Sequence, residues 1–119
     1  MIDTLYREEI LEHYKDPHNF GKLKKFNRSS KQLNPFCGDE IEVFTKINDG
    51  KLKEISFLGS GCAISISAAS ILTDFAKGKS AASLTKFTQE DMLSLLGVEV
   101  SETRKKCAFL ALSVLKDCL

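Results

Sequence analysis

The sequence predicts an α+β fold, because segments with strand character precede residue 60 and segments with a helical pattern follow it. Strand-like alternation is clearest in residues 40–58, and apolar residues then recur at helical spacing up to the C-terminus. The length of 119 residues and the 43% hydrophobic content suit one domain with one modest core, so we predict a single domain over residues 1–119.

A helix is expected first, over residues 3–15. Asp3 could cap it, and a loose apolar stripe would face the core, made of Leu5, Ile10, Leu11 and Tyr14. Pro17 disfavours a helical backbone at the preceding residue, so the helix should end there. Residues 23–31 form a weaker strand candidate.

A β-hairpin is the strongest strand prediction. In residues 40–47, one face carries Ile41, Val43, Thr45 and Ile47, and the other carries more polar residues. The turn sequence NDG at residues 48–50 is typical of a tight hairpin. Residues 51–58 are therefore expected to return as the second strand.

Four helical segments are expected after Cys62. The first carries apolar residues at helical spacing up to Gly78, and a short turn capped by Ser80 follows. Thr88 with Asp91 resembles a capping pattern for a helix that ends at Gly97. Ser101 then caps a last helix, whose apolar side holds Cys107, Leu110, Ala111, Val114, Leu115 and Cys118.

Charge and composition exclude several functions. The net charge is +1 and only residues 22–31 form a basic stretch, which favours a solvated surface over a nucleic-acid or membrane partner. No apolar run reaches the roughly 20 residues of a membrane helix, and no secretory signal is visible. We therefore expect a cytoplasmic protein, where four cysteines favour metal binding or catalysis over disulfides.

Three of the cysteines lie in contexts that favour thiolate chemistry. Cys37 lies in the turn sequence NPFCGD, Cys62 follows GSG where a strand becomes a helix, and Cys107 follows RKK inside the last helix. Unpaired N–H groups at a helix start stabilise a thiolate. The chain has 24 residues between Cys37 and Cys62 and 44 residues between Cys62 and Cys107. A site shared by the three cysteines could therefore form only in the folded chain.

Asp39 would complete a four-coordinate site with Cys37, Cys62 and Cys107. Three thiolates and a carboxylate suit zinc or iron. The carboxylate is the harder and more exchangeable ligand, which fits a site that passes sulfur or iron on. Arg104 lies three residues before Cys107 and could lower its thiol pKa or hold an anionic sulfur species.

Each of these residues could also have a purely structural role. A cysteine in an apolar stripe is more often core than ligand, and this reading is preferred for Cys118. His13 and His18 are the only histidines, and we assign them surface or packing roles. From the residues alone, the prediction stops at a cysteine-rich metal or sulfur site.

The chain resembles the IscU/SufU/NifU N-terminal family of iron–sulfur cluster assembly scaffolds over nearly its whole length. The resemblance is carried by LYREEILEHY (5–14), PHNFG (17–21), NPFCGD (34–39), GCAIS (61–65), SAAS (67–70) and KCA (106–108). It implies an N-terminal helix and a three-stranded antiparallel sheet with helices on one side. It also places the family's ligands on Cys37, Asp39, Cys62 and Cys107.

The resemblance further implies a scaffold, not an enzyme, that accepts persulfide sulfur from a PLP-dependent cysteine desulfurase. A transient [2Fe–2S] cluster or a zinc ion would be bound, and recipient apo iron–sulfur proteins would be the partners. Cys37 and Cys107 are the candidate sulfur acceptors, with Arg104 in support. The alternative is a zinc-dependent sulfur relay of the SufU type that builds no cluster itself.

The third cysteine lies in a sequence closer to the SufU branch. IscU-like members have a histidine where this chain has Lys106, and a Leu-Pro-Pro-Val-Lys motif where it has ETRK at residues 102–105. SufU-like members usually carry an insertion between the second and third cysteines, whereas the 44-residue spacing here is IscU-like. The sequence thus combines features of both branches.

Overall fold

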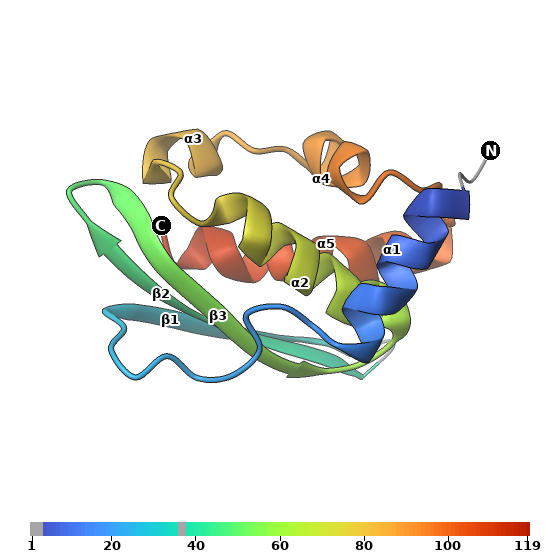
Figure 1. The fold of residues 1–119 in the computed structure, drawn as a ribbon, viewed down its shortest axis with the longest axis horizontal. Helices are drawn as coiled ribbons and strands as arrows, with labels where there is room; N and C mark the ends of the chain where they lie inside the picture. The colour runs from blue at the N-terminus through green and yellow to red at the C-terminus, as the bar shows by residue number, and fades with distance from the viewer. Residues whose placement is uncertain (1–3, 36–37) are drawn as a thin grey trace.

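The computed structural model describes residues 4–35 and 38–119. A helix opens the chain, three strands follow, and four helices complete it (Figure 1). The elements are α1 (Thr4–Lys15), β1 (Arg28–Asn34), β2 (Asp39–Asn48), β3 (Lys51–Ser60), α2 (Ala63–Ala76), α3 (Ala81–Thr85), α4 (Gln89–Leu96) and α5 (Glu102–Asp117). This order confirms the predicted α+β class.

The sheet is antiparallel throughout, in the order β1-β2-β3. Its register brings Asn34, at the end of β1, opposite Asp39, at the start of β2, and pairs Glu40 with Ser60 at the end of β3. One end of the sheet therefore gathers the β1–β2 connection and the β3–α2 junction. This is the end at which the sequence places its candidate ligands.

The first strand differs from its predicted position over residues 23–31. Strand β1 begins at Arg28, and the chain before it forms a loop under the outer face of the sheet. There the Phe26 ring packs edge-on against Phe44, with 5.1 Å between ring centroids. Phe44 is buried on the face that was expected to be polar, because this loop covers it. Pairing with β2, which local sequence does not encode, sets the bounds of β1.

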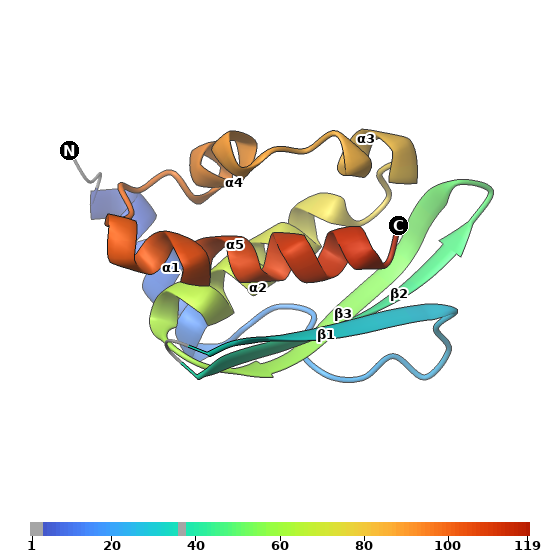
Figure 2. The same ribbon diagram turned by 180° about the vertical axis from the view of Figure 1, so that it is seen from behind.

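Helices α2 and α5 cover the other face of the sheet, and α1 lies across α2 (Figures 1 and 2). Alternation along β2 turns Ile41 and Val43 into this layer, where they meet apolar residues of both helices. The largest fully buried side chains include Phe57, Leu72 and Leu115. The predicted arrangement of helices on one side of the sheet is confirmed.

The predicted helix ends are largely confirmed. Thr88 and Asp91 form a reciprocal capping box for α4, and Gly97 ends that helix in the left-handed conformation with φ of 70°. Ser80 accepts a hydrogen bond from the Ser83 amide at the start of α3. Ser101 does precede α5, but its side chain makes no capping bond, and its hydroxyl lies 3.2 Å from that of Thr103.

The apolar stripe predicted for α1 was partly wrong. Ile10 is buried as expected, but Leu11 and Tyr14 are exposed, and the buried face carries His13 instead. The reason is that α1 packs on α2 and not on the sheet, where buried hydroxyl groups of α2 give a histidine a partner. None of the helices in the described ranges is long and apolar enough to span a lipid bilayer.

Truncation of Leu72 tests the core. Leu72 is 1% exposed, so Leu72→Ala should leave a cavity and lower the free energy of unfolding by about 2–5 kcal/mol. Leu11→Ala is the matched control, because Leu11 is 46% exposed and should change the free energy by less than about 1 kcal/mol. Urea unfolding curves of the two variants give both values, and equal losses would contradict the assigned core.

Candidate metal centre

Three candidate ligands meet at the end of the sheet. Asp39 begins β2, Cys62 lies directly before α2, and Cys107 lies within α5. One ligand atom from each of them lies within 4.8 Å of the other two. Two sulfurs and a carboxylate oxygen are donors that zinc and iron both accept, so the donor set fits such an ion.

Asp39 is held by the start of α2. Its side chain is 1% exposed, and Oδ1 accepts a hydrogen bond of 3.1 Å from the backbone N–H of Cys62. Its other oxygen, Oδ2, lies 3.9 Å from Cys62 Sγ. A carboxylate at the N-terminus of a helix is stabilised by the unpaired N–H groups there. Asp39 thus caps α2 and presents an oxygen to the sulfur.

Gly61 makes this close approach possible. A Cβ atom at this position would lie 2.5 Å from Asp39 Oδ1 and 2.6 Å from Ser65 Oγ, and the backbone φ of 155° also disfavours a side chain. Position 61 of the GSGC segment therefore requires glycine, because the Asp39 carboxylate lies directly against it. The sequence showed the glycine but not the group that requires it.

The environment of Cys62 favours its thiolate. Burial acts to raise the pKa of the thiol, but hydrogen bonds from Ser65, from the Cys107 thiol and from the Ile64 amide outweigh burial, so the pKa lies below its ordinary value. The Ser65 hydroxyl lies 3.7 Å from Sγ and also bonds the Cys62 carbonyl at 3.0 Å. Cys62 as a whole is half-buried.

Cys107 is fully buried on α5, whereas Arg104 and Lys106 are both exposed. Lys106 lines a cavity of about 300 Å³ beside Asn34 and Pro35, at the end of β1. This lysine therefore lies next to the β1–β2 connection. The supporting role of Arg104 stays a prediction.

Cys37 lies outside the described residues, so its part in the site stays a prediction. The chain on either side of it is described. The Gly38 amide donates a hydrogen bond of 2.8 Å to the Asn34 carbonyl, and Gly38 adopts a φ of 70°.

Cys118 lies in the core, as predicted. It is fully buried, and its Sγ lies 3.8 Å from the Val43 carbonyl oxygen. Burial raises the pKa of this thiol to about 11. None of Cys62, Cys107 and Cys118 takes part in a disulfide. The fold therefore favours the thiolate at Cys62 and disfavours it at Cys118.

Sequence reasoning missed a second group of potential ligands. His13 and His18 lie beside Asp74 of α2, and one ligand atom from each of the three lies within 4.8 Å of the others. More than 50 residues separate Asp74 from either histidine, and nothing local to the chain links them. Only the packing of α1 on α2 brings them together.

Alkylation should distinguish the cysteines. Because its pKa is about 11, only about one Cys118 thiol in a thousand is ionised at pH 8, whereas the thiolate of Cys62 is favoured. In metal-free protein at pH 8, iodoacetamide should therefore modify Cys62 well before Cys118, as peptide mapping by mass spectrometry would show. In urea the difference should vanish. Equal rates in the folded protein would contradict the assigned environments.

Comparisons with known proteins agree with this geometry. A profile of the family described as NifU-like N terminal domain matches residues 5–119. The iron–sulfur cluster assembly scaffold protein IscU 1 of Archaeoglobus fulgidus is 30% identical over 115 residues, which cover 97% of this chain and 74% of that protein. The zinc-dependent sulfurtransferase SufU of Bacillus subtilis is 34% identical over 132 residues, with 97% and 89% covered.

A solved structure shows the same fold. The crystal structure of an N-terminal NifU-like protein from Brucella abortus matches with a TM-score of 0.79, over 95% of this chain and 90% of that one. The two sequences are 19% identical, so this likeness concerns the fold.

Proposed function

Because the chain belongs to the family of NifU-like N-terminal domains, we propose that it is an iron–sulfur cluster assembly scaffold. In this proposal it accepts persulfide sulfur from a PLP-dependent cysteine desulfurase and transfers an assembled cluster to apoproteins. The cluster, a transient [2Fe–2S] unit, would be held by Cys37, Asp39, Cys62 and Cys107.

One observation carries the proposal, namely the convergence of Asp39, Cys62 and Cys107 within 4.8 Å. These ligands come from three elements that only the tertiary fold brings together. A purely structural zinc site is usually closed by cysteine or histidine. A buried carboxylate in the set instead supports a site that exchanges its cargo, because oxygen is a harder donor than sulfur toward iron.

The protein's own groups prepare the site for a thiophilic ion. The lowered pKa of Cys62 favours the thiolate, which is the form that ligates. Asp39 has one oxygen fixed by the Cys62 amide, and its second oxygen lies 3.9 Å from the Cys62 sulfur. The protein therefore supplies oriented donors.

The zinc-dependent sulfur relay is the second candidate. The Bacillus subtilis relative named a zinc-dependent sulfurtransferase supports it, as do the exposed cations Arg104 and Lys106 around the third cysteine. Zinc would be bound by the same four ligands, and a desulfurase residue would displace one thiolate. The released thiolate of Cys37 or Cys107 would attack the outer sulfur of the desulfurase persulfide, and the desulfurase cysteine would leave as a thiolate.

Burial constrains one of the two acceptor candidates of this relay, Cys107. Cys107 is fully buried, so acceptance at this position requires a local opening at the start of α5. Arg104, one helical turn earlier and exposed, would then stabilise the persulfide anion. The role of the protein as a scaffold or as a sulfurtransferase depends on which of the two reactions its thiolates carry out.

Reconstitution tests the proposed function. After anaerobic incubation with iron and sulfide, a scaffold should show a stable visible absorbance, whereas a relay should keep tightly bound zinc and form no cluster. In a separate incubation with a cysteine desulfurase and cysteine, the relay should accept persulfide sulfur. In Cys37→Ala, Cys62→Ala and Cys107→Ala, the bound metal should fall strongly. Cys118→Ala is the matched control and should keep its metal, because Cys118 lies in the core. Equal loss in the control would show that the ligand set is wrong.

Asp39 should control cluster release. Removal of its carboxylate leaves three thiolates and takes away the exchangeable ligand, so cluster transfer from Asp39→Ala to an apo-acceptor should be slower than from the parent. Asp39→Asn separates ligand exchange from the capping of α2, because its amide oxygen can still accept a hydrogen bond from the Cys62 N–H. The decay of cluster absorbance measures transfer, and faster decay in both variants would contradict this role.

A further inference from the structure

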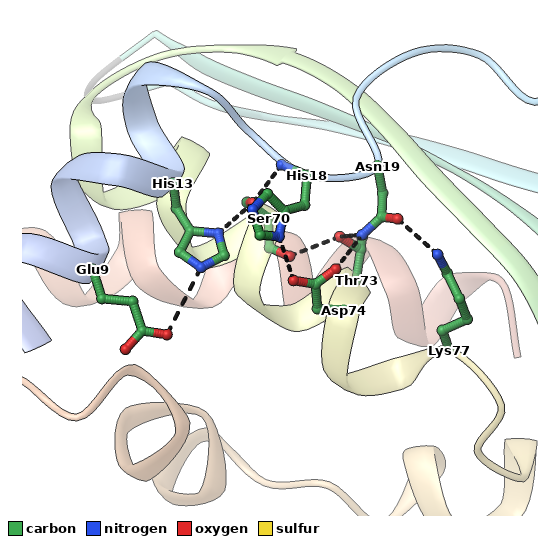
Figure 3. Close-up of polar contacts among 8 residues, drawn as sticks. All are labelled: Glu9, His13, His18, Asn19, Ser70, Thr73, Asp74 and Lys77. Atoms are coloured by element: carbon green, nitrogen blue, oxygen red, sulfur yellow. Dashed lines mark hydrogen bonds and ion pairs between the residues drawn. The ribbon is translucent and has the colours of Figure 1, made fainter.

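A second cluster of metal-ligating side chains lies on α2, away from the cysteines. His13 of α1, His18 of the following turn and Asp74 of α2 converge there (Figure 3). His18 Nδ1 lies 2.5 Å from Asp74 Oδ2, and the two imidazole rings are 4.4 Å apart between centroids. One ring nitrogen from each histidine and one carboxylate oxygen lie within 4.8 Å of one another.

Neighbours outside the group hold the side chains of His13 and Asp74 and the backbone of His18. Ser70 Oγ lies 2.6 Å from His13 Nδ1 and accepts a hydrogen bond of 2.8 Å from the His18 backbone N–H. Asn19 donates to the other oxygen of Asp74 at 2.8 Å (Figure 3). Hydrogen bonds of this kind, which fix ligands that could otherwise rotate, are typical of metal sites.

Either ring nitrogen of His13 could bind an ion, because the other would still lie near an oxygen atom. Nδ1 faces Ser70, and Nε2 lies 3.8 Å from Glu9 Oε1. Whichever nitrogen binds an ion, the second keeps an oxygen as its neighbour. The Ser70 contact orients the ring in the way expected of a ligating imidazole, whereas the distance to Glu9 is too long for a hydrogen bond.

The surrounding charges favour a cation. Glu9 and Glu12 of α1 face His13 together with Asp74, and Lys77 is the opposing charge, bonded to Asn19 Oδ1 at 2.8 Å. Burial, followed by the charge of His18, lowers the pKa of His13. Hydrogen bonds with His18 and Asn19 outweigh the effect of burial and lower the pKa of Asp74.

The cluster is separate from the cysteine centre. Asp74 lies twelve residues beyond Cys62 on the same helix, which corresponds to about 18 Å along the helix axis. No residue is shared between the two groups of ligands. The side chains of His18 and Asp74 are each about half exposed, so an ion can enter directly from solvent.

We propose that His13, His18 and Asp74 form a second binding site for a divalent transition-metal ion such as Zn²⁺. Two imidazoles and one carboxylate suit such an ion, with an open position for water. The three ligands come from α1, from the turn after it and from α2. A bound ion therefore fastens the N-terminal helix to the helix that carries Cys62.

The chain contains only two histidines, so their ring signals report on this site alone. Zinc is added stepwise to metal-free protein while imidazole resonances are followed by NMR. The first equivalent fills the thiolate centre, whose loading a parallel Co²⁺ titration reports through sulfur-to-metal charge-transfer absorbance. A second equivalent should shift the resonances of both rings without a further change in that absorbance.

Two variants and one control complete the test. Asp74→Asn keeps the shape of the ligand and removes its charge, and His18→Gln keeps a donor for Asp74 but cannot ligate zinc. Each should raise the Kd of the second zinc ion by about 10- to 100-fold. Glu90→Gln, which removes an exposed carboxylate on α4, should leave the Kd unchanged.

The zinc titration of the parent protein tests the second site even if a variant folds poorly. If neither ring responds to zinc beyond the first equivalent, the cluster is only a hydrogen-bond network that docks α1, and the proposal is wrong. Parent-like affinity in Asp74→Asn would also overturn it.

Discussion

The hydrogen bond between the Asp39 carboxylate and the Cys62 amide is the contact on which the candidate metal centre depends. It joins the first residue of β2 to the residue that precedes α2, and so fixes the end of the sheet against the start of the helix. A carboxylate that is 1% exposed would be costly without such a partner. Both the register of β2 with β3 and the missing side chain of Gly61 serve this contact.

Helix α2 contacts both groups of candidate ligands through its buried hydroxyl groups. Its buried hydroxyl groups each have a different partner: Ser65 bonds the Cys62 carbonyl, Ser67 bonds the Ile10 carbonyl, and Ser70 lies against His13. Small polar residues let α1 approach closely and also satisfy its polar groups. The serines of α2 therefore contact a cysteine at one end of the helix and a histidine farther along it.

The contrast between Cys62 and Cys118 shows how the fold assigns chemistry to one residue type. Both are thiols, but hydrogen bonds lower the pKa of the first, while burial raises that of the second to about 11. A metal ligand must be deprotonated at neutral pH, so the two cysteines differ in what they can bind. Flanking residues indicated this difference correctly, because the glycines before Cys62 mark a helix start and Cys118 has none.

Much of the fold follows from local sequence. Alternation and the NDG turn predict the β2–β3 hairpin, and the Thr88–Asp91 pair and Gly97 predict the bounds of α4, because these signals act between near neighbours. The position of β1 and the buried face of α1 were predicted only in part, since both depend on partners distant in the sequence. Pairing with β2 sets the first, and packing on α2 sets the second.

The sequence by itself determined the residue types of the cysteine centre, because glycine, aspartate and cysteine occur there in short and distinctive segments. Only the tertiary structure decided that Asp39, Cys62 and Cys107 lie within 4.8 Å, and that Asp39 reaches the Cys62 amide. It alone brought His13 and His18 to Asp74. The physical reason is that ligand geometry depends on strand register and helix packing, which are contacts between segments that the chain itself keeps far apart.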